Sequence, residues 1–590
     1  MNGNRNNMFL AIALSALVIF GWQYFVVAPQ MKADQARQAA LAHQVKPQPQ
    51  SAAEPASVPG MAGSTAHMTR TAALKASGER VAIDSPLLDG SIALKGAKLD
   101  DLRLKKYRET LDPKSPEIVL LAPKSTAYPY YAEFGWIGAN APSDQSVWKQ
   151  EGTSTLSPGH PVTLSWDNGQ GLTFTRVISV DDQYMFSVSD SVANKSGQAQ
   201  TLYPFAYVAR EGVPKEQTSW VLHQGFVGVA NGSETDANYS DFKDDGTPPK
   251  NFSSTGGWVG VTDKYWMAAV IPPQNETYNG AYRGSTIAGD TKAYQANYRL
   301  GARIIASGAQ VQVTHRLFAG AKVVDILRAY EKSQGISRFD NAVDWGWFWF
   351  LTQPLFWLLD IFYKFIGNFG IAILMLTVVV KILFFPLANA SFKSMSRMKK
   401  VQPFMEEIKK AHKDDAQRQQ QEMMALYKRE KVNPLTGCLP MLIQIPVFFS
   451  LYKVLYVTIE MRQAPFYGWI HDLSAPDPTS ILNLFGLLPY HIPAFLPAYL
   501  SIGIWPILMG ITQFIQTKLN PAPADPVQAK MFTFMPLIFT FMFATFPAGL
   551  VIYYTWNNLL SVTQQYVIMR REGVQVHLFE NLKFGKAKAT

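Results

Sequence analysis

The chain has 590 residues, a formal net charge of +10 and an isoelectric point near 9.2. This length allows several domains, and the basic balance indicates contact with an anionic surface, either lipid or nucleic acid. The single cysteine, Cys438, excludes an intramolecular disulfide, so a domain outside the cytosol must be stabilised by its core alone. The sequence contains no HExxH, Walker A or GxSxG motif. We therefore expect no enzyme activity, no cofactor and no metal site.

The amino-terminal segment, residues 1–28, has about 20 apolar residues behind Arg5 and is predicted to be a transmembrane anchor. Its apolar stretch is longer than the usual core of a signal peptide, and Pro29 follows where a cleavage site would need small residues, so we expect no cleavage. Residues 29–79 are rich in Ala, Gln, Pro and Ser. Such a segment cannot bury enough apolar surface to become ordered, and it is predicted to be a flexible linker.

Residues 80–335 consist of short β-type runs separated by Gly, Asn and Asp. The runs 172–180 and 184–192 flank two aspartates, as the strands of a hairpin would, and residues 309–318 alternate apolar with polar side chains. This pattern predicts a large soluble β-sandwich domain, closed by a short helix at Lys322–Glu331. Its Trp and Tyr residues are interpreted as packing, with peptide or lipid binding in a cleft as the alternative.

Residues 336–366 include a tryptophan-rich segment, Asp344–Phe365, that contains Pro354. Aromatic side chains at this density are typical of the membrane–water boundary. Only three residues separate this segment from the next apolar run, so both could not span a membrane. We predict an amphipathic helix in the outer interface, with a transmembrane helix as the alternative.

Residues 367–571 are predicted to form a membrane domain of five transmembrane helices, which gives six with the anchor. The predicted spans are 367–387, 437–460, 495–517, 531–546 and 550–569. Residues 480–494 are apolar but contain two prolines, and a re-entrant or interfacial segment is predicted there. The fold class is therefore a polytopic α-helical membrane protein with a large outer β-sandwich domain.

A polar loop, residues 391–434, contains eleven Lys and Arg residues, more than the later loops. The positive-inside rule places it in the cytoplasm, together with both chain termini and a basic tail at 572–590, and places the β-domain outside. Helical periodicity predicts a hairpin of two helices, 391–412 and 414–431. Its methionines suit the capture of varied apolar sequences, and packing of the hairpin seam is the alternative. They are Met395, Met398, Met405, Met423 and Met424.

Lys381 lies inside the first of these apolar runs. A charge within a span costs about 2.5–3.5 kcal/mol on insertion scales unless water receives it, so Lys381 either extends to the interface or lines a hydrated cavity. On the last span, polar residues recur at helical spacing and share one face. They predict a hydrophilic groove, and a tight interhelical hydrogen-bond network is the alternative. The predicted groove residues are Lys381, Gln444, Gln513, Gln516, Tyr553, Tyr554, Asn557, Asn558, Ser561 and Gln565.

Four blocks of the sequence, 367–381, 421–452, 462–478 and 546–565, resemble in order the signature blocks of the YidC membrane protein insertases and their mitochondrial Oxa and chloroplast Alb relatives. The resemblance covers most of the chain, and the anchor and large outer domain are similar to the Gram-negative form. It implies an inner-membrane protein with a periplasmic domain and a five-helix core, whose groove is closed to the periplasm. Lys381 stands where most relatives carry an arginine that receives polar parts of the substrate.

The resemblance implies that the protein inserts and helps to fold nascent membrane proteins without a nucleotide, alone or with the Sec translocon. The implied partners are nascent membrane proteins, the ribosome, the Sec translocon with SecYEG and the accessory SecDF, and anionic lipids, with no specific nucleic-acid sequence. The alternatives are a secondary transporter that uses Lys381 and a scaffold whose β-domain binds partners. A transporter would be favoured by inverted repeats, which the two halves of the sequence do not show.

Overall fold

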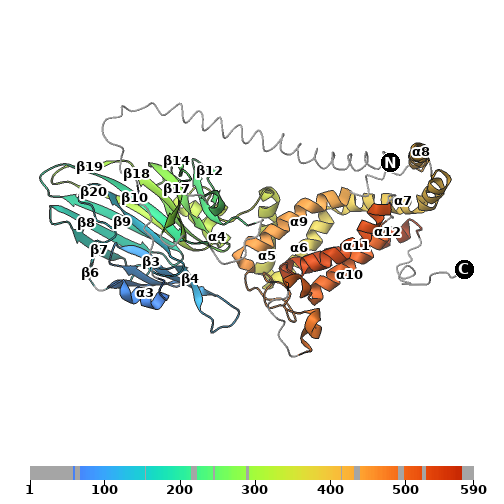
Figure 1. Ribbon diagram of the computed structural model, residues 1–590, viewed down its shortest axis with the longest axis horizontal. Coiled ribbons are helices and arrows are strands. Elements are labelled where there is room, and N and C mark those ends of the chain that lie inside the picture. The colour runs from blue at the N-terminus through green and yellow to red at the C-terminus, as the bar shows by residue number, and fades with distance from the viewer. Residues whose placement is uncertain are drawn as a thin grey trace. The chain divides into compact units, whose positions relative to one another are not determined.

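The computed structural model describes residues 58–59, 67–152, 154–213, 222–242, 246–287, 291–413, 415–430, 439–488, 497–520 and 526–574 (Figure 1). The predicted anchor and most of the predicted linker and basic tail lie outside these residues. The chain divides into two compact units. One contains the β-rich part up to Asp344 together with Val457–Glu460, and the other contains the helices that follow Trp345.

The β-rich unit contains two large sheets whose neighbouring strands pair antiparallel (Figure 1). The first sheet has the order β1 (Arg80–Asp84), β2 (Leu88–Ala93), β3 (Lys98–Arg108), β5 (Tyr130–Ile137), β10 (Gln200–Glu211), β18 (Thr291–Leu300), β17 (Thr277–Ile287) and β14 (Lys250–Thr255), with β4 (Glu117–Leu121) beside β3 and β19 (Arg303–Ile305) beside β10. The second has the order β12 (Ser233–Glu234), β11 (Gly225–Ala230), β15 (Trp258–Thr262), β16 (Trp266–Ile271), β20 (Gln310–Ala321), β9 (Met185–Asn194), β8 (Leu172–Val180), β7 (Val162–Asp167) and β6 (Lys149–Glu151), with β13 (Ala237–Asn238) beside β11.

The predicted hairpin at 172–192 is confirmed as β8 and β9, with Val180 opposite Phe186. Side chains along β8 alternate between buried and half-buried, as expected for a strand with one face on a core. The two sheets pack face to face. A hydrogen bond joins them, in which the Tyr130 hydroxyl on β5 donates to the Val261 carbonyl on β15 at 2.8 Å. The predicted β-sandwich is therefore confirmed.

A fully buried ion pair connects the sheets. Arg176 on β8 donates from Nε and Nη2 to the two carboxylate oxygens of Asp190 on β9, at 2.7 and 2.8 Å. The same guanidinium donates to the carbonyl oxygens of Ala97 and Phe134, which belong to the first sheet or its loops. A buried charge is tolerated when a countercharge and hydrogen bonds satisfy it, and here both are present.

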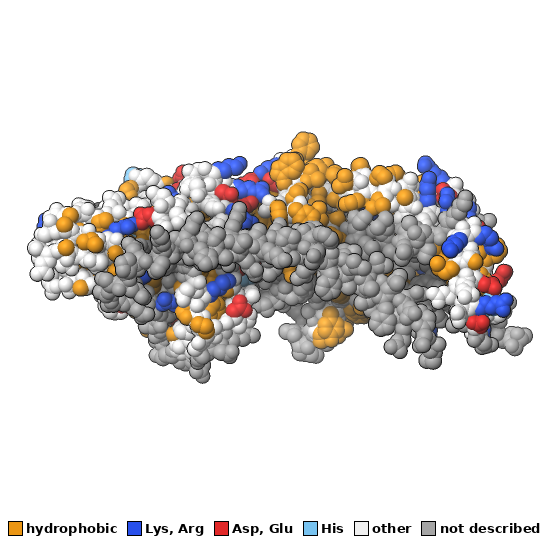
Figure 2. All heavy atoms as spheres, turned by 90° about the horizontal axis from the view of Figure 1, so that it is seen from above, with side chains coloured by type: hydrophobic (Ala, Val, Ile, Leu, Met, Phe, Trp, Pro, Cys, Tyr) orange, Lys and Arg blue, Asp and Glu red, His pale blue; other side chains and the backbone are white. Residues whose placement is uncertain are grey.

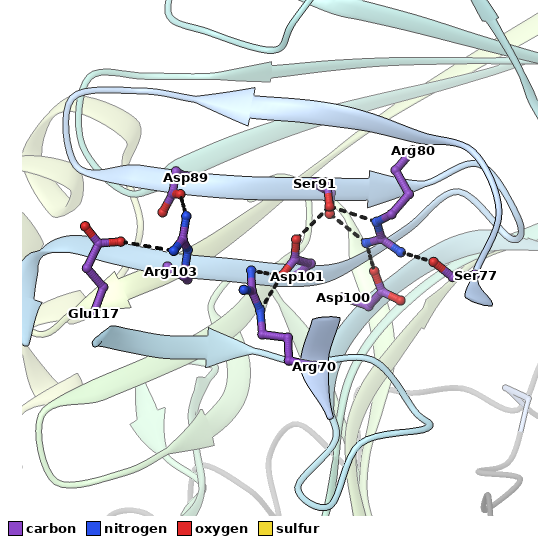
Figure 3. A network of polar contacts seen from close by, with 9 residues as sticks. All are labelled: Arg70, Ser77, Arg80, Asp89, Ser91, Asp100, Asp101, Arg103 and Glu117. Carbon is purple, nitrogen blue, oxygen red and sulfur yellow. Dashed lines mark hydrogen bonds and ion pairs between the residues drawn. The ribbon is translucent and has the colours of Figure 1, made fainter. Parts of the chain in front are cut away.

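The edge of the first sheet carries rows of opposite charge (Figure 3). Asp89 on β2 stands directly opposite Arg103 on β3 and forms an ion pair with it. Arg70 on the short helix α3 (Arg70–Ala76) pairs with Asp101, and Arg80 on β1 pairs with Asp100. A shift of register by one residue would move these side chains to opposite faces, so the pairs favour one register of the edge strands.

The closing helix of the sandwich, predicted at Lys322–Glu331, is α4 (Val324–Gln334). It ends at Gly335, whose φ of 65° is the left-handed conformation common after helices. At its start the Val324 amide donates to Oε1 of Glu460 at 3.1 Å. Glu460 follows a later helix in the chain, which explains why Val457–Glu460 belongs to the β-rich unit.

The second unit is helical. Its described helices are α5 (Trp349–Ile366), α6 (Phe369–Leu383), α7 (Phe385–Ala411), α8 (Ala416–Arg429), α9 (Leu439–Val457), α10 (Ile504–Leu519), α11 (Pro526–Phe543) and α12 (Ala548–Arg571). Each predicted span overlaps one of them, and α10 begins nine residues after the start of the predicted span at 495. The segment at 480–494, predicted to be re-entrant or interfacial, is described up to residue 488 and contains a short 3-10 helix at Ile481–Gly486.

The apolar run around Lys381 is interrupted where a continuous span was predicted. The chain bends by 69° between α6 and α7, and Pro386 in the first turn of α7 has no amide hydrogen to continue the hydrogen bonding of α6. Among the residues that the structure describes, this bent pair meets the length and hydropathy expected of a membrane span, and no unbroken helix does. The predicted number of six spans stays a prediction.

Two further predictions concern α5 and the helical hairpin. The tryptophan-rich segment forms α5, which retains Pro354 and stacks Tyr363 on Phe369 of α6 with ring centroids 3.6 Å apart. Two helices, α7 and α8, occupy the region of the predicted hairpin, and they pack through an apolar cluster of Met398, Val401, Met405 and Leu426, which we call the seam. The cytoplasmic position of this hairpin stays a prediction. In Figure 2, hydrophobic side chains gather over the helical unit, and basic side chains gather at its α7–α8 end.

Candidate functional site

Lys381 lies near the end of α6 and is half-buried. Its Nζ donates to Oγ of Ser561 on α12 at 2.6 Å, and that hydroxyl in turn donates to the Asn557 carbonyl at 2.8 Å. A hydrogen bond from a charged donor is about twice as strong as a neutral one, so this contact fixes the ammonium against α12. Two of the predicted groove residues, Lys381 and Ser561, are thus in direct contact.

A cavity of about 500 Å³ opens beside Lys381, between the α6–α7 bend and the second half of α12. Apolar side chains of the three helices form much of its lining. The polar and charged residues that line it are Lys381, Asn389, Lys393, Thr563, Gln564, Arg571 and Glu572. Three cations and one carboxylate leave the lining with a net positive charge, which favours a polar or acidic group inside.

Gln564 adds an unused donor to this cavity. Its Nε2 is buried and has no hydrogen-bond partner within the described part of the chain. A buried amide without a partner costs roughly 1–3 kcal/mol, and a polar group in the cavity would recover part of that cost. The lining therefore combines charge with free hydrogen-bonding capacity.

Most of the other predicted groove residues form separate, partly buried hydrogen-bonded pairs between α12 and its neighbours. Gln444 on α9 donates to the Tyr553 hydroxyl at 2.8 Å. Asn558 donates to Oε1 of Gln513 on α10 at 3.0 Å, and Gln565 donates to Oδ1 of Asn520 at 3.1 Å. These contacts match the alternative of interhelical hydrogen bonds, and they hold α12 against α9 and α10.

Three predicted groove residues remain. Tyr554 packs against Phe448 of α9 and Phe543 of α11, each with ring centroids 5.1 Å away. Asn557 is buried on α12, and Gln516 is half-buried on α10. Of the ten predicted groove residues, Lys381 lines the 500 Å³ cavity. Ser561 does not line it but accepts a hydrogen bond from Lys381.

The cavity is lined by a face of α12 that lies next to the polar face predicted from the sequence. Leu560, Thr563, Gln564, Val567 and Arg571 follow the i, i+3, i+4, i+7 and i+11 spacing of a single helical face. The sequence signal for this face is weak because two of the five residues are aliphatic. On α7, Asn389 and Lys393 lie one turn apart, but the bend at Phe384 decides that they face the same cavity as Lys381.

The predicted capture methionines are divided between the seam and the surface of the hairpin. Met398 and Met405 are buried in the seam, and Met423 packs against them. Met395 on α7 is half-buried. Met424 on α8 is 51% exposed and borders a shallow surface hollow with Gln420 and Lys428. Three of the five methionines, Met398, Met405 and Met423, thus pack in the seam of the hairpin, as the alternative interpretation expects.

The loop at 462–478 forms hydrogen bonds with the starts of two helices. The amides of Ala548 and Gly549, at the first turn of α12, donate to the carbonyls of Ala475 and Leu473 at 2.7 and 2.9 Å. Asp477 accepts from the Trp505 amide at 2.9 Å in the first turn of α10. The first amides of a helix have no hydrogen-bond acceptor within the helix, and this loop supplies acceptors for them. It covers the end of α12 opposite to Arg571 and the cavity.

A helical unit with a cation-lined cavity between α6, α7 and α12, in one chain with a β-sandwich, defines a two-domain protein. The family model for the YidC periplasmic domain matches residues 80–358, and the model named 60Kd inner membrane protein matches residues 361–575. The chain belongs to the YidC family of membrane protein insertases. The β-sandwich unit is accordingly the family's periplasmic domain.

Individual relatives support the same assignment along nearly the whole chain. The membrane protein insertase YidC of Methylobacterium radiotolerans is 53% identical, over 99% of this chain and 97% of the relative. That of Rhizobium meliloti is 52% identical, over 98% of both. A crystal structure of an active YidC insertase with its first transmembrane domain resolved is 17% identical, with a TM-score of 0.35, over 82% of this chain and 92% of that chain.

Proposed function

We propose that the cavity beside Lys381 receives the polar flank of a nascent transmembrane segment while the apolar part of the segment moves into lipid. The observation that carries this proposal is the Lys381 ammonium, which contacts Ser561 and lines a 500 Å³ cavity with two further cations, Lys393 and Arg571. A flank with one or two carboxylates would exchange water for these cations and for the free donor of Gln564. This shortens the apolar path that the flank must cross.

The energy for insertion comes from the substrate and the membrane. Each buried CH₂ of the segment contributes about 0.8 kcal/mol. An acidic flank that crosses the membrane adds about 2.3 kcal/mol per charge for each 100 mV of potential. These sources suffice in principle without a nucleotide, which agrees with the absence of nucleotide motifs from the sequence.

The proposed topology has six spans, one in residues 1–28 and five in 367–571. Residues 80–335 lie in the periplasm behind a linker at 29–79, and residues 336–366 lie in the outer interface. The hairpin at 391–434, the tail at 572–590 and both termini lie in the cytoplasm. Exposed apolar side chains on several helices support contact with lipid. They include Trp357, Ile382, Leu383, Ile511, Phe534, Leu537 and Ile538.

The hairpin is the proposed contact for the ribosome and for anionic lipid headgroups. Lys410, Lys413, Arg418, Lys428 and Arg429 are exposed on α7, α8 and the turn between them. Clustered cations attract the phosphates of both ribosomal RNA and lipid. The Sec translocon, with SecYEG and SecDF, is proposed as a second partner on the family resemblance. The exposed Met424 is the best-placed of the five methionines to touch an emerging apolar segment.

The experiment reconstitutes the full chain in liposomes and follows insertion of a small two-span protein with an acidic translocated flank. Lys381→Leu should lower the insertion rate about tenfold, which corresponds to about 1.4 kcal/mol of lost stabilisation in the rate-limiting step. Lys381→Arg should retain activity because it keeps the charge. Lys530→Leu is the matched control, since it removes a lysine that is exposed on α11 and does not line the cavity. Unchanged insertion of the acidic substrate by Lys381→Leu would contradict the proposal.

A further inference from the structure

Two residues of the predicted linker, Val58 and Pro59, lie against the first sheet of the periplasmic domain. Val58 is only 4% exposed and packs in one apolar cluster with Tyr131, Phe205, Tyr207 and Ala209. These side chains come from β5 and β10. Tyr207 stacks on Phe205 with ring centroids 6.0 Å apart and meets Tyr131 edge to face.

This surface is the side of the sheet that points away from the sandwich core. Strand neighbours alternate between the two faces of a sheet, and Tyr130 on β5 reaches the opposing sheet. Tyr131 therefore points outward. Directly paired residues of neighbouring strands share a face of the sheet. Tyr131 pairs with Ala209, Ala209 pairs with Gln295, and Gln295 pairs with Arg283, so all four side chains point outward. We call this surface the linker face, made of Tyr131, Phe205, Tyr207, Ala209, Arg283 and Gln295.

The linker face also binds the main chain of the segment on it. Nη1 of Arg283 donates to the Val58 carbonyl at 3.4 Å, and Nε2 of Gln295 donates to the Pro59 carbonyl at 3.2 Å. The two donors stand directly opposite each other on β17 and β18. Consecutive carbonyls held by neighbouring side chains are characteristic of recognition of an extended peptide. A proline fits because the site offers donors, and proline has no amide hydrogen to donate.

Further polar atoms on this face are buried without a partner among the described residues. They are the Tyr131 hydroxyl, Oε1 of Glu211, Nε of Arg283, Oε1 of Gln295 and Nδ2 of Asn297. Buried polar groups are nearly always hydrogen-bonded in native proteins, and five on one sheet face exceed what packing explains. Donors and acceptors are both present, which is the combination that a peptide backbone satisfies. Burial also raises the pKa of Glu211 to about 7, against the opposing effect of Lys124.

We propose that the linker face is a peptide-binding site, and that its occupant is the chain's own linker at Val58–Pro59. The domain thus holds its linker more than twenty residues before β1 begins at Arg80. Met68 is already hydrogen-bonded to Ser125 of the domain. Each extended residue reaches about 3.3–3.6 Å, so docking at Val58 shortens the free tether by the ten residues up to Met68, roughly 35 Å at full extension. The site is independent of Lys381 and of the insertion cavity.

Disulfide trapping in the full-length protein tests this docking. In a Cys438→Ser background, Val58→Cys and Ala209→Cys are combined, oxidised mildly, digested and analysed by mass spectrometry for the linked peptides. The matched control pair is Val58→Cys with Thr314→Cys, because Thr314 is exposed on β20 of the other sheet. We expect the disulfide yield of the first pair to be at least about tenfold that of the control pair, because docking raises the effective concentration of the cysteine at 58 beside the cysteine at 209.

Removal of the two carbonyl anchors tests the mechanism. Arg283→Met with Gln295→Leu should lower the yield of the Val58→Cys/Ala209→Cys disulfide several-fold, to near that of the control pair. Arg316→Met with Gln312→Leu removes the same chemical groups from β20 and should leave the yield unchanged. Equal linking of the two cysteine pairs would overturn the docking. An undiminished link after loss of both anchors would overturn the assigned recognition of the carbonyls.

Discussion

The fully buried Arg176 and the half-buried Lys381 are cations that the protein accommodates in different ways. Arg176 in the periplasmic domain has a bidentate carboxylate and two carbonyls, so its charge and donors are met within the fold. Lys381 contacts a neutral hydroxyl and faces a cavity with further positive charge. The first arrangement stabilises a fixed structure. The second leaves a charge available to a group that enters from outside.

His315 illustrates the cost of a buried titratable group in the periplasmic domain. It lies on β20, fully buried, and its Nδ1 is 2.6 Å from the Tyr298 hydroxyl on β18. Burial lowers the pKa of His315 to about 4; Asp190 raises this pKa, while Arg176 and Arg303 lower it. The native state therefore binds fewer protons than the unfolded state between pH 6.5 and 4. In this window stability falls as the pH falls.

We predict that the periplasmic domain loses up to about 3 kcal/mol of stability through His315 as the pH falls from 6.5 to 4. His315→Gln should remove this part of the pH dependence, although it lowers stability at neutral pH by disturbing Tyr298. The measurement is urea unfolding of the full chain at several pH values, followed by hydrogen exchange in β8, β9 and β20. His160→Gln, at an exposed position, is the control. An equal pH dependence in His315→Gln and the unsubstituted chain would contradict the prediction.

Strands and helices differ in how well their sequence patterns predicted them. The alternation in β8, β9 and β20 correctly predicted these strands and the hairpin of β8 and β9, because one face of each strand packs on the core. The apolar run around Lys381 did not show its 69° break, since a proline in the first turn of a helix is common and favours neither outcome.

The candidate site was predictable in part for a related reason. A lysine inside an apolar run requires a polar environment wherever the run lies, so Lys381 could be identified from the sequence as a candidate site residue. The polar face of α12 was also evident, but the same spacing fits a groove and a set of hydrogen bonds to neighbouring helices. The residues packed against that face decide between the two. Gln513 on α10 and Asn520 just after it bind Asn558 and Gln565, two of the polar residues of the face. The cation Arg571 is not distinctive in sequence, because basic residues are usual at the end of a helix.

Two helices of the second unit, α6 and α10, and the apolar part of α11 are short for a lipid bilayer. The 15 residues of α6 extend about 22 Å and the 16 residues of α10 about 24 Å, against a hydrocarbon core of about 30 Å. The apolar part of α11, Lys530–Phe543, is shorter still. We predict that the bilayer is locally thinned beside α11 and α12, because each Å of mismatch otherwise exposes polar ends to hydrocarbon.

Spin-label depth measurements test this thinning. A label replaces Thr545, which is exposed in the turn between α11 and α12, whereas Ala548 is buried and hydrogen-bonded. If the bilayer is thinned, the label should be relaxed strongly by a polar reagent and weakly by oxygen. A label at Leu537, exposed midway along α11, should show the opposite ratio and serves as the control. A Thr545 label deep in hydrocarbon would mean instead that the turn lies below an unperturbed surface.

The whole chain combines two units with separate cores, and the candidate insertion site belongs to one of them. Lys381, its cavity and the loop that covers the start of α12 all lie in the helical unit. The periplasmic sandwich has its own buried ion pair and its own closing helix, α4. We therefore predict that deletion of Val81–Gly320 leaves insertion within about twofold of the full chain, since function resides in the site and not in the fold around it.

The deletion retains α4 and Glu460, so the Val324 amide keeps its carboxylate partner at the start of the helix. Val324, Leu327 and Tyr330 of α4 lose the sandwich that buries them, so the variant also needs Leu327→Ser and Tyr330→Ser to limit aggregation. Insertion is measured in liposomes beside the full chain and beside the deletion combined with Lys381→Leu, which should again be about tenfold slower. Loss of insertion in a folded deletion variant that still contains Lys381 would place part of the insertion site in the periplasmic domain.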